Sequence, residues 1–165
     1  MKILVLNDTN ILNEKFLRRG LSKVINKISY DNLGSDVLTE NLGMDFGITD
    51  RSHKLFMIKK NLLWSDVVIF VTENKKDISR NAKSWIGLAQ ESFSNLSPEE
   101  LMLVNLERKL HILTFNSVKD SEFLLDNLIE ELSTLKFKSI NCLFAEDILS
   151  DSSTIVYDNK ALVSV

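Results

Sequence analysis

The sequence predicts an α/β protein with a five-stranded parallel sheet and helices on both of its faces, in one domain spanning residues 1–165. Two observations predict this class. Five short candidate strands recur along the chain, and the continuous apolar runs among them, such as "KILVL" and "VVIFV", are typical of strands buried on both faces of a parallel sheet. Segments with apolar residues three and four positions apart alternate with these runs and indicate amphipathic helices. Strands that alternate with helices in this way form right-handed crossovers.

The first half of the chain contains three of the predicted strands. Strand one is "KILVL", an apolar run that ends at polar "NDTN", and strand three is "VVIFV", the clearest strand in the sequence. Between them, apolar residues at helical spacing predict two helices, and two glycines mark a loop. In order, the predicted elements are a strand at 2–6, a helix at about 11–28, a strand at 35–42, a loop at 43–52, a helix at 54–66 and a strand at 67–71.

The second half continues the alternation. Trp85 and its apolar neighbours fall on one face of a helix. "SPEE" around Pro98 indicates the start of a further helix, because proline fits the first helical position and acidic residues favour the first turn. The tail after Ser150 stays open: "DN" between two apolar runs suggests a hairpin, but a pair of strands without a fifth helix would be unusual. The remaining predicted elements are a helix at about 78–93, a strand at 109–115, a helix at 121–135 and a strand at 139–145.

Composition limits the class of protein. The chain is 44% hydrophobic and 26% charged, as is usual for a soluble globular protein. Its formal net charge of −3 argues against a nucleic-acid-binding surface. The opening residues lack the apolar region of a signal peptide, and no apolar run is long enough to span a membrane, so we expect a cytoplasmic protein without membrane contact. The single cysteine, Cys142, cannot form an intramolecular disulfide and is expected to be a buried thiol.

The candidate site lies at the carboxyl ends of the strands, near the switch point between strands one and three, where open α/β sheets bind ligands. Thr9, Asn10 and Asn13 follow strand one and could donate hydrogen bonds to a phosphate. Asp8 and Glu14 oppose this, because they place negative charge beside an anion. Capping of the first helix by the same polar residues is the simpler interpretation.

Other constellations give weaker signals. None of the five glycines lies in the turns after strands one, three or four, which argues against a conventional nucleotide or flavin cradle. Asp8, Glu73 and Asp120 could hold Mg²⁺ together, but acidic residues in loops are usually just solvated, so no metal site is predicted. His53 and His111 have no motif partner, and His111 is expected to be a structural residue of its strand.

Three stretches carry a resemblance to a known family. "MKILVLNDTNILNEKF" looks like a first strand with its phosphate loop, and "LKFKSINCLFAED" looks like the family's "LGFxGIxxVxxIxAEG". "SDVVIFVTENKKDISRNAKSWIG" follows the spacing of "ADxIVxxxPxYNxxIPxxLKxWID". Over nearly its whole length the chain therefore resembles the flavodoxin-like NAD(P)H oxidoreductases, in the branch of FMN-dependent azoreductases and quinone reductases. The resemblance implies a three-layer sandwich with strand order 2-1-3-4-5. The matching hallmarks of the central motif are Ser65, Asp66, Ile78, Lys83, Trp85 and Ile86.

The departures from the family pattern cluster at its flavin-binding loops. The Pro-x-Tyr-Asn that follows strand three in the family is "TENK", residues 72–75, in this chain. The serine-rich phosphate loop keeps one hydroxyl, that of Thr9. The glycine pair after strand four aligns with Ser117 and Val118, and the glycine that precedes strand four is Arg108. The loops are therefore degenerate while the scaffold pattern is kept.

Two functions stay open. In the first, the chain passes hydride from NAD(P)H through FMN to a quinone-like or azo acceptor. In the second, it has lost FMN and serves as a partner-binding or regulatory scaffold, as the missing glycines and the charged turn suggest. The resemblance implies a homodimer through helices beside the strand-three turn, with an exposed apolar stripe around Trp85, Leu88 and Phe93. The cofactor-binding residues that it implies are Thr9, Asn10 and Asn13 for the phosphate, and Thr72, Asn74, Lys75, Asn116 and Ser117 for the rest of the flavin.

Overall fold

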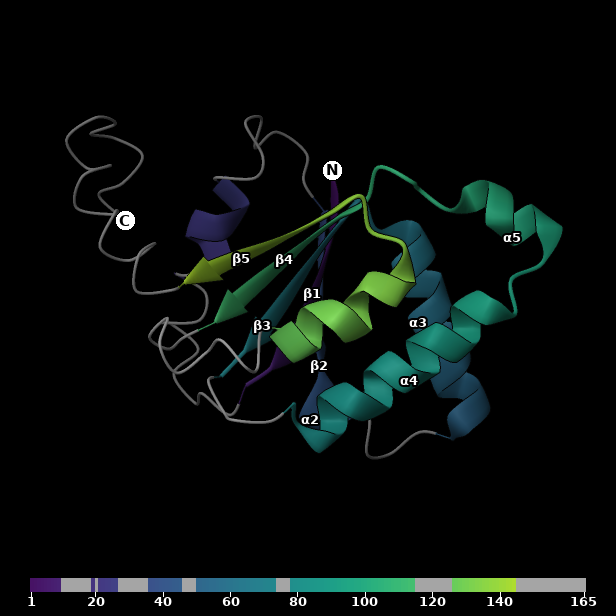
Figure 1. Ribbon diagram of the computed structural model, residues 1–165, viewed down its shortest axis with the longest axis horizontal. Coiled ribbons are helices and arrows are strands. Elements are labelled where there is room, and N and C mark those ends of the chain that lie inside the picture. The colour runs from purple at the N-terminus through teal and green to yellow at the C-terminus, as the bar shows by residue number, and fades with distance from the viewer. Residues whose placement is uncertain are drawn as a thin grey trace.

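The sheet has five parallel strands in the order β2-β1-β3-β4-β5, which confirms the predicted architecture (Figure 1). The computed structural model describes residues 1–9, 19, 21–26, 36–45, 50–73, 78–114 and 126–144. Each strand lies within two residues of its predicted bounds. The strands are β1 (Lys2–Asp8), β2 (Asp36–Asn41), β3 (Val67–Thr72), β4 (Lys109–Thr114) and β5 (Ser139–Phe144).

Alternate residues of the strands pack into two separate cores, one on each face of the sheet. The larger core contains Leu4 and Leu6 of β1 together with side chains of α3 (Arg51–Trp64), α4 (Arg80–Ser94) and the helical residues 126–132. The smaller core contains Ile3, Val5 and Val24, the last from the helical residues 21–26. Figure 1 shows α4 and the 126–132 segment side by side in front of the sheet. β3 is buried along its whole length because both faces are covered.

Local capping determines where the helices begin. α3 starts three residues before its predicted start, because the side chain of Asp50 accepts a hydrogen bond from the backbone N–H of His53. Ser97 and Glu100 form the capping box of α5 (Pro98–Leu103), with Pro98 in the first turn as predicted. A short helix, α2 (Leu42–Asp45), occupies part of the predicted loop at 43–52, which corrects that prediction. The 126–132 segment ends in the 3₁₀ turn η1 (Ser133–Leu135).

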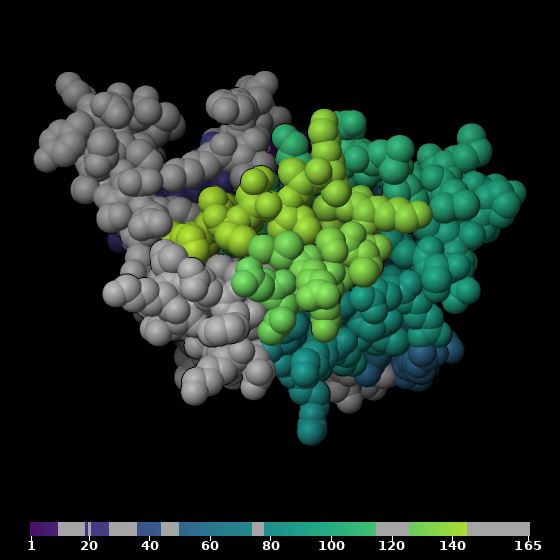
Figure 2. Space-filling model, viewed as in Figure 1, coloured from purple at the N-terminus to yellow at the C-terminus, as the bar shows by residue number. Residues whose placement is uncertain are grey.

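The predicted apolar stripe on α4 is wrong. Trp85 is 1% exposed and Phe93 is 8% exposed, because both side chains belong to the larger core. Within the described ranges, a group of large exposed apolar side chains lies instead on α5 and the segment after it, at Leu101, Met102, Leu103 and Leu106. Figure 2 shows this region standing out at the rim of the molecule. Among the described helices, none has the length and apolar composition needed to cross a membrane.

A buried arginine lies at the amino edge of the sheet. Arg108, immediately before β4, is 0% exposed, and its guanidinium donates to the carbonyl oxygens of Leu62 (2.5 Å) and Leu135 (3.2 Å). These carbonyls lie in the last turn of α3 and at the end of η1, where a positive charge is favoured. The guanidinium carbon also lies 5.1 Å from the ring centroids of both Phe93 and Phe137. Arg108 therefore joins two helical segments to the sheet.

Candidate cofactor site at the carboxyl edge of the sheet

Three polar residues lie level with one another at the carboxyl ends of β1, β3 and β4. Asp8 pairs with Thr72, and Thr72 pairs with Thr114. Side chains that are level across parallel strands project from the same face of the sheet. Each of the three follows by two residues a member of the larger core, namely Leu6, Phe70 and Ile112. This polar row (Asp8, Thr72 and Thr114) therefore lies on the α4 side of the sheet, at the switch point between β1 and β3.

Asp8 is tied to the start of α4. Ser79 Oγ lies 2.8 Å and 2.7 Å from the two carboxylate oxygens of Asp8, and it also accepts a hydrogen bond from the backbone N–H of Ala82 at 3.0 Å. Ser79 is therefore the N-cap of α4 and a donor to Asp8 at once. A carboxylate near a helix N-terminus is favoured by the partial positive charge there. The pair joins the end of β1 to the beginning of α4.

A second set of polar contacts shapes the chain as it leaves β1. The backbone N–H and the hydroxyl of Thr9 both donate to Asn7 Oδ1, at 3.2 Å and 2.7 Å. The Asn7 side-chain amide in turn donates to Asn41 Oδ1 at 2.9 Å. Asn7 thus forms an Asx turn and connects the ends of β1 and β2. This turn lies immediately before the segment in which the phosphate-binding residues are predicted.

The two threonines of the polar row differ in their hydrogen bonding. Thr72 Oγ1 donates to the backbone carbonyl of Glu73 at 3.1 Å. Thr114 is 0% exposed, and its Oγ1 has no hydrogen-bond partner in the part of the chain that the structure describes. Buried hydroxyls are nearly always bonded, so Thr114 is the unusual member of the row.

The structure places two of the eight predicted cofactor-binding residues. Thr9 and Thr72 lie at the carboxyl edge, at the ends of β1 and β3. Ser79 and Thr114 were missed. "DIS" before an amphipathic run is an N-cap signal for Ser79, and a hydroxyl at the last position of an apolar strand is the signal for Thr114. The other six predicted residues, Asn10, Asn13, Asn74, Lys75, Asn116 and Ser117, lie outside the described residues.

Grooves open between the helices on the same side of the sheet. One of about 480 Å³ separates α4 from the segment 126–134, where Gln90 Nε2 donates to Thr134 Oγ1 at 3.0 Å. It reaches the start of α4 at Ile78 and Lys83, and its other lining residues are polar or acidic. A groove of about 280 Å³ lies between α3 and α4. The larger groove lacks the mainly apolar lining that is usual for a drug-sized ligand.

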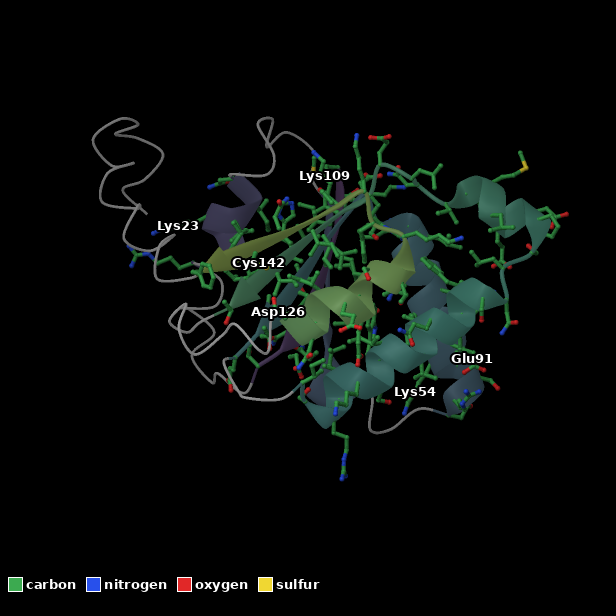
Figure 3. All side chains as sticks on the ribbon, viewed as in Figure 1. Lys23, Lys54, Glu91, Lys109, Asp126 and Cys142 are labelled. Atoms are coloured by element: carbon green, nitrogen blue, oxygen red, sulfur yellow. The ribbon has the colours of Figure 1, made fainter. Side chains whose placement is uncertain are left out.

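Candidate acid–base and metal chemistry is limited in the described residues. Burial, and then the charge of Lys109, lowers the pKa of His111, which is 8% exposed in β4. Burial, and then Asp126, raises the pKa of the Cys142 thiol, so Cys142 stays protonated and is a poor nucleophile. Figure 3 shows Lys109 near the start of β4 and Cys142 on β5 beside Asp126. Within the described ranges, which exclude Asp120, no three acidic, cysteine or histidine side chains are grouped as metal ligands.

Comparison with solved structures identifies the architecture. An NADH:FMN oxidoreductase matches with a TM-score of 0.57 at 14% identity, over 91% of this chain and 83% of the other. The fold is flavodoxin-like. An azoreductase from Bacillus anthracis matches this flavodoxin-like chain with a TM-score of 0.55 at 10% identity, over 91% and 93% of the two chains. An NAD(P)H:quinone oxidoreductase from Methanothermobacter marburgensis matches with a TM-score of 0.55 at 8% identity, over 87% and 82%. No family model and no curated protein matches the sequence.

Proposed function

We propose that this protein is an FMN-dependent NAD(P)H oxidoreductase that reduces a quinone-like or azo acceptor. The observation that carries the proposal is the flavodoxin-like sheet, whose switch point between β1 and β3 opens onto the polar row. The solved structures that share the fold include an NADH:FMN oxidoreductase, an azoreductase and a quinone oxidoreductase. Since fold alone does not determine chemistry, the residues at the edge must also suit a flavin.

The position of Asp8 is compatible with a flavin phosphate. The helical residues 21–26, which follow β1 along the chain, contribute Val24 to the smaller core. Asp8 bonds to Ser79 on the other face of the sheet, where α4 packs. A phosphate bound on the face of the sheet that residues 21–26 cover would lie on the opposite side of the sheet from the Asp8 carboxylate. The carboxylate of Asp8 would then face away from a phosphate bound there.

The chain's own groups would hold the cofactor at three strand ends. Thr9, Asn10 and Asn13 are proposed to face the phosphate, and Lys75 to place a positive charge on the ring side. Thr72, Asn74, Asn116 and Ser117 are proposed to provide the remaining polar contacts. When bound, FMN supplies the chemistry of hydride transfer between NAD(P)H and the acceptor. The protein's part is to position the two substrates and to exclude water.

Steady-state turnover tests the activity. Purified protein loaded with FMN should oxidise NADH or NADPH in the presence of a small quinone or an azo dye, and the absorbance of the nicotinamide reports the rate. The matched control is the same protein without added flavin. Equal rates with protein plus FMN and with free FMN alone would refute the oxidoreductase proposal.

We also infer a homodimer that forms through helices beside the strand-three turn. α4 follows β3 along the chain and is therefore the helix proposed to lie at the dimer contact. The support is the resemblance to the azoreductase and quinone reductase branch. Sedimentation velocity at several protein concentrations should give the mass of two chains. A monomer at all concentrations would exclude the dimer and would leave the flavin proposal standing.

A further inference from the structure

The hydroxyl of Thr114 is buried and has no hydrogen-bond partner among the described residues. Thr114 ends β4 in the polar row, is 0% exposed, and its Oγ1 finds no partner in the described ranges of the chain. The other two members of the row each take part in a hydrogen bond: Asp8 accepts from Ser79, and Thr72 donates to the carbonyl of Glu73. Thr114 therefore stands out at the edge where a ligand is expected.

Packing alone does not explain a threonine at this position. The preceding β4 residues Leu110, Ile112 and Leu113 are all 0% exposed and apolar. Valine has the same shape as threonine and the same preference for strands, but it buries no hydroxyl. A buried hydroxyl without a partner destabilises a fold, so valine would give the more stable protein. A bound ligand that accepts a hydrogen bond from the hydroxyl would explain why residue 114 is a threonine rather than a valine.

The chemistry of the position fits the edge of a flavin ring. A threonine hydroxyl carries one hydrogen that it can donate, and Thr114 gives this hydrogen to no described group. The ring system of a flavin presents carbonyl oxygens and ring nitrogens that accept hydrogen bonds. Thr114 lies level with Thr72 at the carboxyl end of the neighbouring strand, at the edge proposed for the cofactor.

We propose that Thr114 is a binding residue of the flavin site and donates a hydrogen bond to an acceptor on the ring of FMN. This inference rests on the proposed function and adds a residue that the family resemblance did not indicate. On this inference, the hydroxyl lowers stability in the protein without flavin and raises affinity in the complex. The melting temperature without flavin and the Kd for FMN measure these two effects separately.

The test compares Thr114→Val with a matched buried hydroxyl at the other edge of the sheet. Ser65 is 1% exposed, and its Oγ donates to the carbonyl of Leu62 at 3.0 Å, immediately before β3. Two quantities are measured for wild type, Thr114→Val and Ser65→Ala: the melting temperature without flavin, and the Kd for FMN from quenching of flavin fluorescence.

The two variants should respond in opposite ways. Without flavin, Thr114→Val should melt at the wild-type temperature or a few degrees higher, about 2–4 °C, because an unbonded buried hydroxyl has been removed. Its Kd for FMN should rise about fivefold to tenfold, the effect of one lost hydrogen bond. Ser65→Ala should melt at a lower temperature and bind FMN with the wild-type Kd.

Three results would overturn the inference, and they are distinguishable. If wild type binds FMN and Thr114→Val binds it equally well, the role of Thr114 is excluded while the proposed function stands. If Thr114→Val without flavin is destabilised as much as Ser65→Ala, the hydroxyl has a structural partner and the argument from burial is wrong. If wild type itself binds no FMN, the proposed function and the role of Thr114 both fail.

Discussion

Replacement of Arg108 by alanine should be among the most damaging single changes in this protein. The guanidinium is fully buried, bonds to the carbonyls of Leu62 and Leu135, and lies 5.1 Å from the centroids of two phenylalanine rings. Burial lowers the pKa of Arg108 to about 10, so the side chain is still charged at neutral pH. Its charge is therefore carried at a cost, which the two carbonyls and the two rings offset.

The size of the effect follows from the volume that the side chain fills. Truncation of a large, fully buried side chain to alanine typically costs about 2–5 kcal/mol. Arg108→Ala also leaves the carbonyl of Leu135 short of a donor, whereas the carbonyl of Leu62 keeps its bond from Ser65. We expect a loss of about 3–5 kcal/mol in the free energy of unfolding. Arg108→Met fills most of the same space without a buried charge but also leaves the Leu135 carbonyl without this donor, so it should cost about 1–3 kcal/mol, less than the alanine variant.

Urea unfolding followed by tryptophan fluorescence at neutral pH measures both variants. The denaturant dependence of the unfolding free energy should be the same in all three proteins, so that the midpoints alone report stability. A loss below about 1 kcal/mol for Arg108→Ala would refute the structural role of the arginine. A methionine variant as unstable as the alanine variant would show that charge, rather than packing, dominates the contribution.

Three further predictions concern Ser79, Asp8 and His111. Ser79→Ala removes the N-cap of α4 and should lower the unfolding free energy by about 1 kcal/mol, measured in urea. A double-mutant cycle of Ser79→Ala with Asp8→Ala should give a coupling energy of about 0.5–2 kcal/mol, and a value near zero would contradict the bond between them. Because burial lowers the pKa of His111 below 6.5, the unfolded chain binds more protons than the folded chain as pH falls through 6.5. Stability should therefore fall through that range and level off below the folded-state pKa. His111→Leu should flatten the pH dependence of the melting temperature, and a dependence as steep as that of wild type would contradict this role of His111.

The sheet could be predicted from the sequence because its signal is local. β1 and β3 are continuous apolar runs, so their position between two helix layers follows from the runs themselves. The buried state of Arg108 could not be predicted in the same way. "NLERKL" is a polar segment by itself, and the carbonyls and rings that surround the arginine come from segments remote in the sequence.

In the candidate site, too, some features could be predicted from the sequence and others could not. The position of Thr9 and Thr72 at the carboxyl edge follows from strand order, which the family resemblance supplied. The role of Asp8 could not be predicted, because its partner Ser79 is 71 residues away along the chain. Read alone, Asp8 is an anion beside an expected phosphate. In the fold, Asp8 accepts a hydrogen bond from Ser79, the N-cap of α4, on the side of the sheet where α4 packs.

Binding of FMN to the wild-type protein tests the central claim most directly. The melting temperature should be recorded against rising FMN, with riboflavin as the matched ligand that lacks the phosphate. If the carboxyl edge holds FMN, saturation should raise the unfolding free energy by about 2.7 kcal/mol at a hundredfold excess over Kd, or about 5–10 °C, and riboflavin should shift it less. A melting temperature that stays constant at every FMN concentration would contradict the account.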